Sequence, residues 1–258
     1  MNILRIFAAV GKAARRVAAG AGRSFRFARR IVSGLGSPGT WSPVVLTQAR
    51  RLGVDSLPVA LFIALFTGVV LALQSSYAFT GAVPPYFVGT LVGKTIILEL
   101  GPVLTGLVLA GRVGANIAAE LGTMRVTEQI DALETLGYDP VAYLVVPRVL
   151  AGLVTVPIIV GFAVVMGIAA GWITSVILLE ISSLEFVRGL RMFHRGFDVT
   201  FALIKSASYG IVITAVGAGF GFHTRGGAEG VGRVTTRAVV VACMAILLLD
   251  ALWAVVLL

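Results

Sequence analysis

Residues 56–93 read SLPVALFIALFTGVVLALQSSYAFTGAVPPYFVGTLVG and contain no charged side chain. A membrane-spanning helix needs about 20 mainly apolar residues, so this run is too long for one span and too short for two. The adjacent prolines Pro84 and Pro85 interrupt helical hydrogen bonding inside it. The sequence therefore predicts one spanning helix at about 57–80 and a second that starts at about residue 86.

The composition of the whole chain also indicates a membrane protein. Of its 258 residues, 58% are hydrophobic and 13% are charged, with a mean hydropathy of +0.99. Soluble domains are about 45–50% apolar and about 25% charged. The fold class predicted is an all-α integral membrane protein with five transmembrane helices, the second of them kinked at Gly101-Pro102. The five spans are expected at about 57–80, 86–110, 149–179, 200–222 and 238–257.

The distribution of lysine and arginine predicts the orientation. With the N-terminus inside, the cytoplasmic segments 1–55, 112–148 and 223–237 hold 10, 3 and 3 basic residues, whereas the outer segments hold only Arg188, Arg191 and Arg195. Positively charged loops stay on the cytoplasmic side. A multi-pass protein of a bacterial inner (cytoplasmic) membrane is predicted, although a plastid envelope protein would look similar.

Residues 1–44 are expected to comprise a basic amphipathic helix on the membrane surface and the linker GLGSPGTWSP (Gly34–Pro43). The membrane domain is expected at residues 45–258. Such a helix suits an anionic cytoplasmic leaflet. An organellar transit peptide is the alternative for this acid-free start. The basic face comprises Lys12, Arg16, Arg23, Arg26 and Arg30, and the apolar face Ile3, Phe7, Val10 and Val17.

Several kinds of chemistry are excluded or weakly supported by the sequence. The chain has no G-x-x-x-x-G-K-[ST] motif, so it cannot cradle ATP in a P-loop. Its two histidines, His194 and His223, are predicted on opposite sides of the membrane, and Cys243 is the single cysteine. No catalytic or metal site is predicted, and the location of the basic charge argues against nucleic acid as a partner. The chain is expected not to be an enzyme.

Four ionisable side chains lie inside predicted spans: Lys94, Glu99, Lys205 and Asp250. Each costs about 2.5–3.5 kcal/mol at a helix centre on insertion scales, so each needs a partner, water or a role. Structural pairing or snorkelling is expected for Lys94 and Asp250. For Glu99 and Lys205 the sequence leaves two readings open, structural pairing and the lining of a transport pathway.

Glycines spaced by four, at 89/93, 167/171 and 217/221, allow close approach of helices. They indicate either internal packing, which is favoured for any single pair, or a dimer seam.

A polar segment, GRVGANIAAELGTMRVTEQIDALETLGYDP (Gly111–Pro140), lies between spans two and three. It predicts a short cytoplasmic helix with Thr127 as its cap, Glu128 and Asp131 in its first turn, and Gly137 with Pro140 at its end. Met124, Ile130 and Leu133 form an apolar edge among charged residues, a pattern typical of a helix that fits a partner's groove. A membrane protein with such a helix and no nucleotide site indicates an ABC-transporter permease.

Three stretches carry a family resemblance: the segment from Leu98 to Gly152, the block TRGGAEGVGRVTTRAVV (Thr224–Val240), and LIKS (Leu203–Ser206). From about residue 45 onward the chain resembles the MlaE-type permeases, which serve Mce-associated lipid transporters. The resemblance implies a lipid-transport permease, with phospholipid as the cargo, that works as a homodimer. It also implies a cytoplasmic ATPase that binds ATP and Mg, so that this chain holds no cofactor, and an Mce-domain protein on the far side.

The resemblance also implies roles for particular residues. The lipid cavity would include Gln74, Tyr77, Glu99 and Lys205. Many relatives have arginine before the glutamate, where this chain has Leu98, which suggests a different headgroup contact. The ATPase-coupling region would be Glu120–Leu133, with Glu120, Thr123, Met124, Arg125, Glu128, Gln129, Asp131 and Leu133 as its contacts.

Two other function classes remain open at this point. An ion- or proton-coupled secondary transporter would use Lys94, Glu99, Lys205 and Asp250 as relay groups, although the absence of an internal repeat weakens it. A purely structural membrane subunit would need the same residues only for folding.

Overall fold

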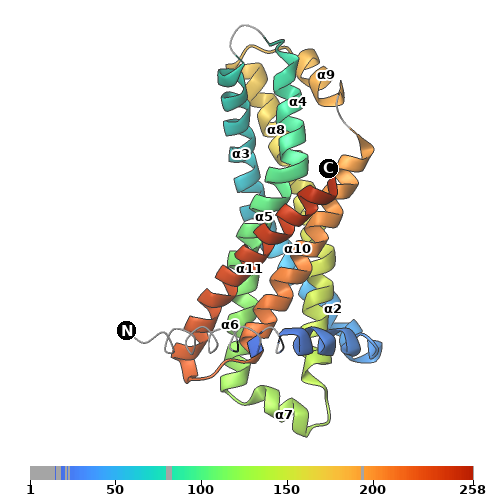
Figure 1. Ribbon diagram of the computed structural model, residues 1–258, viewed down its shortest axis with the longest axis vertical. Helices are drawn as coiled ribbons and strands as arrows, with labels where there is room; N and C mark the ends of the chain where they lie inside the picture. The colour runs from blue at the N-terminus through green and yellow to red at the C-terminus, as the bar shows by residue number, and fades with distance from the viewer. Residues whose placement is uncertain are drawn as a thin grey trace, which may run out of the picture.

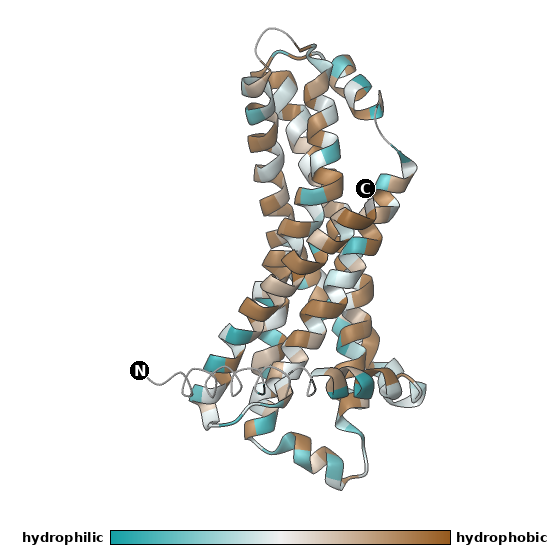
Figure 2. Ribbon diagram, in the orientation of Figure 1, coloured by the Kyte–Doolittle hydropathy of each residue, from teal (hydrophilic) through white to brown (hydrophobic). Residues whose placement is uncertain are grey.

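Five long helical stretches cross the molecule in one elongated bundle (Figure 1). The computed structural model describes residues 15, 19–20, 22, 24–79, 83–192 and 195–257, and these form no strand. Each stretch is long and apolar enough to span a membrane, so the chain is an all-α integral membrane protein. Hydrophobic residues dominate the middle of the bundle, and hydrophilic ones gather at α7 and at the lower ends of α6 and α11 (Figure 2).

The first span is preceded by surface helices. Residues 24–34 are helical, the chain turns at residues 35–37, and α2 (Pro38–Gly53) and the short η1 (Val54–Ser56) lead into α3 (Leu57–Ala78). The predicted break in the Gly34–Pro43 linker is thus present, but helix resumes at Pro38, which can occupy the first turn without losing a hydrogen bond. Most of the predicted amphipathic helix (Ile3, Phe7, Val10, Lys12, Arg16, Val17 and Arg23) lies outside the described residues.

The second span is one continuous helix whose hydrogen bonding widens twice. It runs through α4 (Tyr86–Thr95), the π-helical turn η2 (Ile96–Leu100), α5 (Gly101–Leu109), the π-helical turn η3 (Ala110–Gly114) and α6 (Ala115–Val126). Pro102 lacks an N–H, so the helix cannot continue regularly past it, which explains the irregular turn beside the predicted kink. Such π-helical turns are frequent at functional sites, and these two carry Glu99 and Arg112.

The remaining elements complete the bundle. The turn η4 (Val141–Val145) leads into α8 (Val146–Leu178), and α9 (Ser183–Met192) joins it to α10 (Gly196–Phe222) and α11 (Gly227–Leu257). Spans two, three and five begin or end well outside the predicted limits, because those limits stop at Arg112, Arg148 and Arg237, whereas the helices continue through these charged residues. The helix α9, which the sequence analysis treated only as a polar connection, packs against α4.

Close helix contacts depend on glycine. A Cβ at Gly68 of α3 would lie 2.0 Å from the carbonyl oxygen of Gly167 on α8, a distance that no side chain allows. The predicted glycine pairs also face elements of the same chain: Gly89 meets the backbone at Phe186, and Gly217 meets that at Gly114. Internal packing, the favoured interpretation, accounts for them. The helix α8 is therefore held at the centre of the bundle, against α2, α3 and α10.

Candidate functional site

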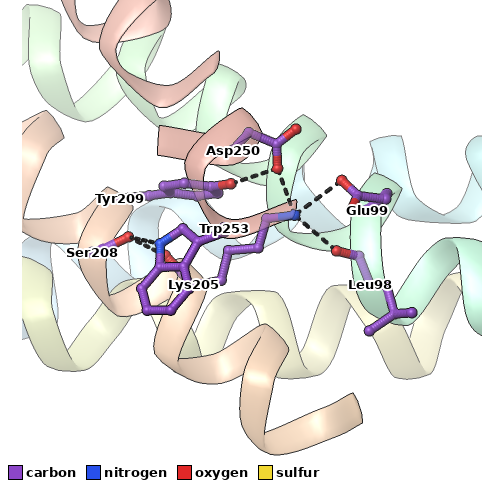
Figure 3. Close-up of polar contacts among 7 residues, drawn as sticks. All are labelled: Leu98, Glu99, Lys205, Ser208, Tyr209, Asp250 and Trp253. Carbon is purple, nitrogen blue, oxygen red and sulfur yellow. Dashed lines mark hydrogen bonds and ion pairs between the residues drawn. The ribbon is translucent and has the colours of Figure 1, made fainter. Parts of the chain in front are cut away.

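Lys205 on α10 is the centre of a polar cluster inside the membrane-spanning bundle (Figure 3). Its side chain is completely buried. Its ammonium donates to the Leu98 carbonyl at 3.0 Å and to Glu99 Oε2 at 2.9 Å, and it forms an ion pair with Asp250 Oδ1 at 2.5 Å. The predicted pairing of Asp250 is confirmed, and its partner is Lys205.

The irregular second span makes this geometry possible. In a regular α-helix the carbonyl of Leu98 would accept from residue 102, but Pro102 has no N–H to donate. That carbonyl is left free for Lys205. Leu98 thus contributes its backbone carbonyl to the cluster.

Aromatic residues brace the cluster from α10 and α11. The Tyr209 hydroxyl donates to Asp250 Oδ1 at 2.9 Å, and the Trp253 indole donates to the Ser208 hydroxyl at 3.0 Å (Figure 3). Phe201 packs edge-on against Trp253. The sequence analysis missed these residues. A signal was available for Tyr209, since it lies four residues after Lys205, one turn further on the same face.

Of the two carboxylate side chains, that of Glu99 is the more exposed. Its side chain is 42% exposed, against 23% for Asp250 and 0% for Lys205. Lys205 therefore does not itself line a surface of this chain; it acts through Glu99, which it orients. Two carboxylates face one ammonium, so the cluster presents acidic character at the Glu99 side.

The other two predicted cavity residues lie on α3. Gln74 lines a groove of about 350 Å³ together with Leu100, the residue after Glu99. Tyr77 is 85% exposed and lies nearly one turn further along α3. The structure places Gln74 near the cluster but shows no contact between either residue and Glu99 or Lys205 among the described residues.

Lys94 pairs with Asp198 at 3.4 Å, near the end of the molecule that carries α9. Asp198 is buried and also accepts from the Arg195 backbone at the start of α10. The expected pairing of Lys94 is thus confirmed.

A broad apolar groove of about 650 Å³ runs between α8, α9 and α10. Its walls include Ile158, Phe162, Val165 and Leu203, with Arg191 as its charged lining residue. Such a surface suits acyl chains rather than a polar solute.

The short helix α7 (Gln129–Thr135) lies at the opposite end of the molecule from α9 (Figure 1). The prediction that Thr127 caps it is wrong. Thr127 ends α6 instead, with its hydroxyl bonded to the Thr123 carbonyl at 2.9 Å, because the chain reverses at Glu128. Glu128 adopts a left-handed backbone, with φ of 61°, and separates the two helices. Gly137, with φ of 83°, ends α7 as expected.

The apolar edge of this region faces inward, which contradicts the interpretation that it is presented to a partner. Ile130 is completely buried, and Met124 and Leu133 pack against the core of the same chain. Burial of this apolar edge therefore holds α7 against the bundle of its own chain. The outward face is instead polar with two apolar side chains: Glu128, Gln129, Asp131, Glu134, Leu136 and Tyr138 are exposed.

The remaining predicted coupling residues lie on α6 and are partly engaged within the chain. Arg125 is paired with Asp131, which ties α6 to α7. Glu120 is bridged by Arg148 at 3.0 Å and by Arg51 at 3.5 Å. Thr123 is exposed. Arg148 is 97% buried by this arrangement, although the sequence analysis treated it only as a loop charge.

The comparisons with known proteins agree with these observations. The family model described as Permease MlaE matches residues 45–256. The chain is 39% identical over 246 residues to a "Probable ABC transporter permease protein" of Rickettsia felis, with 95% of each chain covered. It is 37% identical to the chloroplastic protein TRIGALACTOSYLDIACYLGLYCEROL 1 of Arabidopsis thaliana, covering 80% of this chain and 59% of that one.

A third relative is the "Intermembrane phospholipid transport system permease protein MlaE" of Haemophilus influenzae, 32% identical over 209 residues, with 81% and 80% of the two chains covered. With a family match over most of its length and five spans that hold a buried polar cluster, this chain belongs to the MlaE permease family.

Proposed function

We propose that this chain is the membrane-spanning subunit of an ABC transporter that moves phospholipids between membranes. The observation that carries the proposal is the separation of two surfaces within one MlaE-family bundle. Glu99 and the apolar grooves lie in the spans, and the polar face of α7 lies beyond them. A permease needs both, a surface for cargo in the membrane and a surface for an energy-supplying partner outside it.

The partner for α7 is a separate cytoplasmic ATPase that binds ATP and Mg. The chain has no P-loop of its own. The exposed face of α7 offers carboxylates beside Leu136 and Tyr138, which are 72% and 53% exposed. Apolar anchors ringed by charge are typical of protein interfaces. Arg125 ties α7 to α6 through its ion pair, and Ile130 packs α7 against the core. A displacement of α7 is therefore transmitted to the second span, which carries Glu99.

The proposed assembly uses the same surfaces. The chain works as a homodimer in a bacterial inner membrane, with an Mce-domain protein at the α9 end that exchanges lipid with a cavity between the protomers. The exposed apolar side chains of α3 and α11, including Phe62, Val70, Met244 and Leu248, are available for lipid and for the second copy. Within the cavity, Glu99 supplies the polar contact, Lys205 orients it, and Gln74 and Tyr77 line the wall from α3.

The coupling role of α7 is tested by charge reversal at Glu134, which is exposed and outside the Arg125–Asp131 pair. In proteoliposomes with the partner ATPase, Glu134→Arg is expected to lower lipid transfer about tenfold or more while the purified permease keeps its thermal stability. Asp131→Arg is expected to lower lipid transfer as well, and it also removes the ion pair with Arg125.

Glu185→Arg, on α9 at the other end of the molecule, is the matched control for the ATPase contact and should bind the ATPase normally. Normal ATPase binding and normal transfer in both α7 variants would defeat the assignment.

A gradient-driven secondary transporter is the alternative. The buried cluster of Lys205 with two carboxylates favours it, because intramembrane ionisable groups also serve proton relays. The two functions differ in their energy source.

A further inference from the structure

A second polar site lies away from the Lys205 cluster, in a groove of about 530 Å³ between the end of α2 with η1 and the segment from η3 to α6. We propose that this groove, defined by Gln48, Asp55, Ser56, Arg112 and Asn116, binds the zwitterionic phosphate–amine headgroup of a phospholipid of the cytoplasmic leaflet. The inference goes beyond the proposed function, because a lipid held there need not be the lipid transported.

Two buried polar side chains have no partner except the groove. Gln48 is 8% exposed and Ser56 is 2% exposed, and neither side chain makes a hydrogen bond within the described part of the chain. Their polar atoms are not sealed in the interior: among the described residues the buried side-chain atom without a partner is Arg148 Nε, so those of Gln48 and Ser56 open into the groove. Two such groups on one wall indicate that the groove receives a polar molecule.

The groove also holds one cation and one anion that no other described residue neutralises. Arg112, on the π-helical turn η3, is partly buried and has no ion pair, and Asp55 on η1 is exposed and has none. The other charged lining residues, Arg51 and Glu120, are bridged to each other, and Glu120 also to Arg148. An unpaired arginine beside an unpaired carboxylate matches a ligand that carries both a phosphate and an ammonium.

The position of the groove favours a lipid over a soluble molecule. Asp55 is the last charged residue before the uncharged run that starts at Ser56, and Arg112 is the first charged residue after the apolar run 100–111. Both neighbouring spans thus change from apolar to charged at this groove, which places it at the level of the headgroups. The exposed Val54, which precedes Asp55 in the chain, supplies apolar surface for the acyl chains.

Each group then has a role in recognition. Arg112 pairs with the phosphate, and Gln48, Ser56 and Asn116 supply neutral hydrogen bonds around it. Asp55 pairs with the ammonium. A lipid with phosphate but no amine satisfies Arg112 and leaves Asp55 unpaired, so the site discriminates by headgroup.

The test uses the purified full-length permease in nanodiscs with phosphatidylethanolamine that carries a diazirine on an acyl carbon close to the glycerol. After illumination, labelled peptides are mapped by mass spectrometry, and the same experiment is done with phosphatidylglycerol. We expect labelling by phosphatidylethanolamine within residues 44–56 and 109–123. Arg112→Gln should reduce labelling by both lipids about tenfold.

Asp55→Asn should reduce labelling by phosphatidylethanolamine but not by phosphatidylglycerol. Because Asp55 is exposed, this substitution does not disturb the fold, and it tests headgroup recognition even if the Arg112 variant fails to fold. Arg50→Gln is the matched control. Arg50 is an exposed arginine on α2, next to η1, that does not line the groove, so this variant should label normally.

Equal labelling in all variants would overturn the inference. Displacement by soluble glycerophosphoethanolamine as readily as by lipid would overturn its assignment to a membrane lipid. Absence of labelling in a permease that still transfers lipid would refute this site and leave the proposed function standing.

Discussion

At the scale of single residues, the buried charge of Lys205 is tolerated because its ammonium has hydrogen-bond acceptors and two carboxylate partners. It bonds the Leu98 carbonyl and Glu99 and pairs with Asp250, and Tyr209 donates to Asp250 in turn. Removing a partner of Lys205 leaves a fully buried charge less well paired, which costs more than the cluster contributes. The cluster is therefore a constraint on the positions of α10, α11 and the second span, as well as a source of polarity at Glu99.

Lys205→Met is expected to destabilise the permease by about 3–5 kcal/mol, the usual cost of breaking a buried ion pair. The physical cause is the unpaired carboxylates, so the triple variant that adds Glu99→Gln and Asp250→Asn should recover most of the loss. Thermal unfolding of the three proteins in detergent measures this. A triple variant no more stable than Lys205→Met would show that the charges are not the cause.

At the scale of helices, close packing depends on glycines that permit backbone contact. The α3–α8 crossing brings Gly68 against Gly167, and the α8–α10 crossing brings Gly152 against Gly210. Association of helices in lipid relies on such contacts, because apolar side chains gain little by leaving lipid for each other. These crossings hold α8 directly against α3 and α10.

Gly68→Ala is expected to lower stability by about 1–3 kcal/mol or more, since the added Cβ would overlap the Gly167 carbonyl. Gly161→Ala on α8 is the control, because no atom lies within 4 Å of its added Cβ. The amount of protein in the membrane fraction and its midpoint of thermal unfolding measure both. Equal stability of the two variants would contradict the assigned α3–α8 contact.

At the scale of the whole molecule, the two proposed surfaces lie far apart along the bundle. The helix α7 is at one end and α9 at the other (Figure 1). The Lys205 cluster lies on η2, α10 and α11, within the spans. Coupling between them must pass through the second span, whose two π-helical turns lie between α7 and α4. This arrangement suits a bundle that changes shape when a partner acts on one end.

Lipid transfer by the reconstituted permease with its ATPase is expected to require ATP and to continue when a protonophore collapses the proton gradient. The reason is that α7 offers a mechanical contact, whereas the carboxylates of the cluster are already paired with Lys205. Fluorescent phospholipid transfer between vesicles, with and without ATP, measures this. Transfer that persists without ATP and stops with the protonophore would establish the gradient-driven alternative.

The sequence by itself determined the membrane class, the number of spans and the family, because apolar runs of spanning length and long motifs are local features. It also placed α3 well, since Pro58 and the prolines after residue 83 limit that helix. Helix ends elsewhere extended beyond the predictions, because the helices continue through Arg112, Arg148 and Arg237, where the apolar runs stop.

Only the tertiary structure decided which charges meet and which faces are free. Lys205 finds Asp250 and the Leu98 carbonyl across three spans, and Ile130 turns into the core rather than toward a partner. The groove with Arg112 and Asp55 joins residues far apart in the chain. These features arise from helix packing, which brings together groups that are far apart in the sequence. The spacing of residues along the chain does not determine their distance in space.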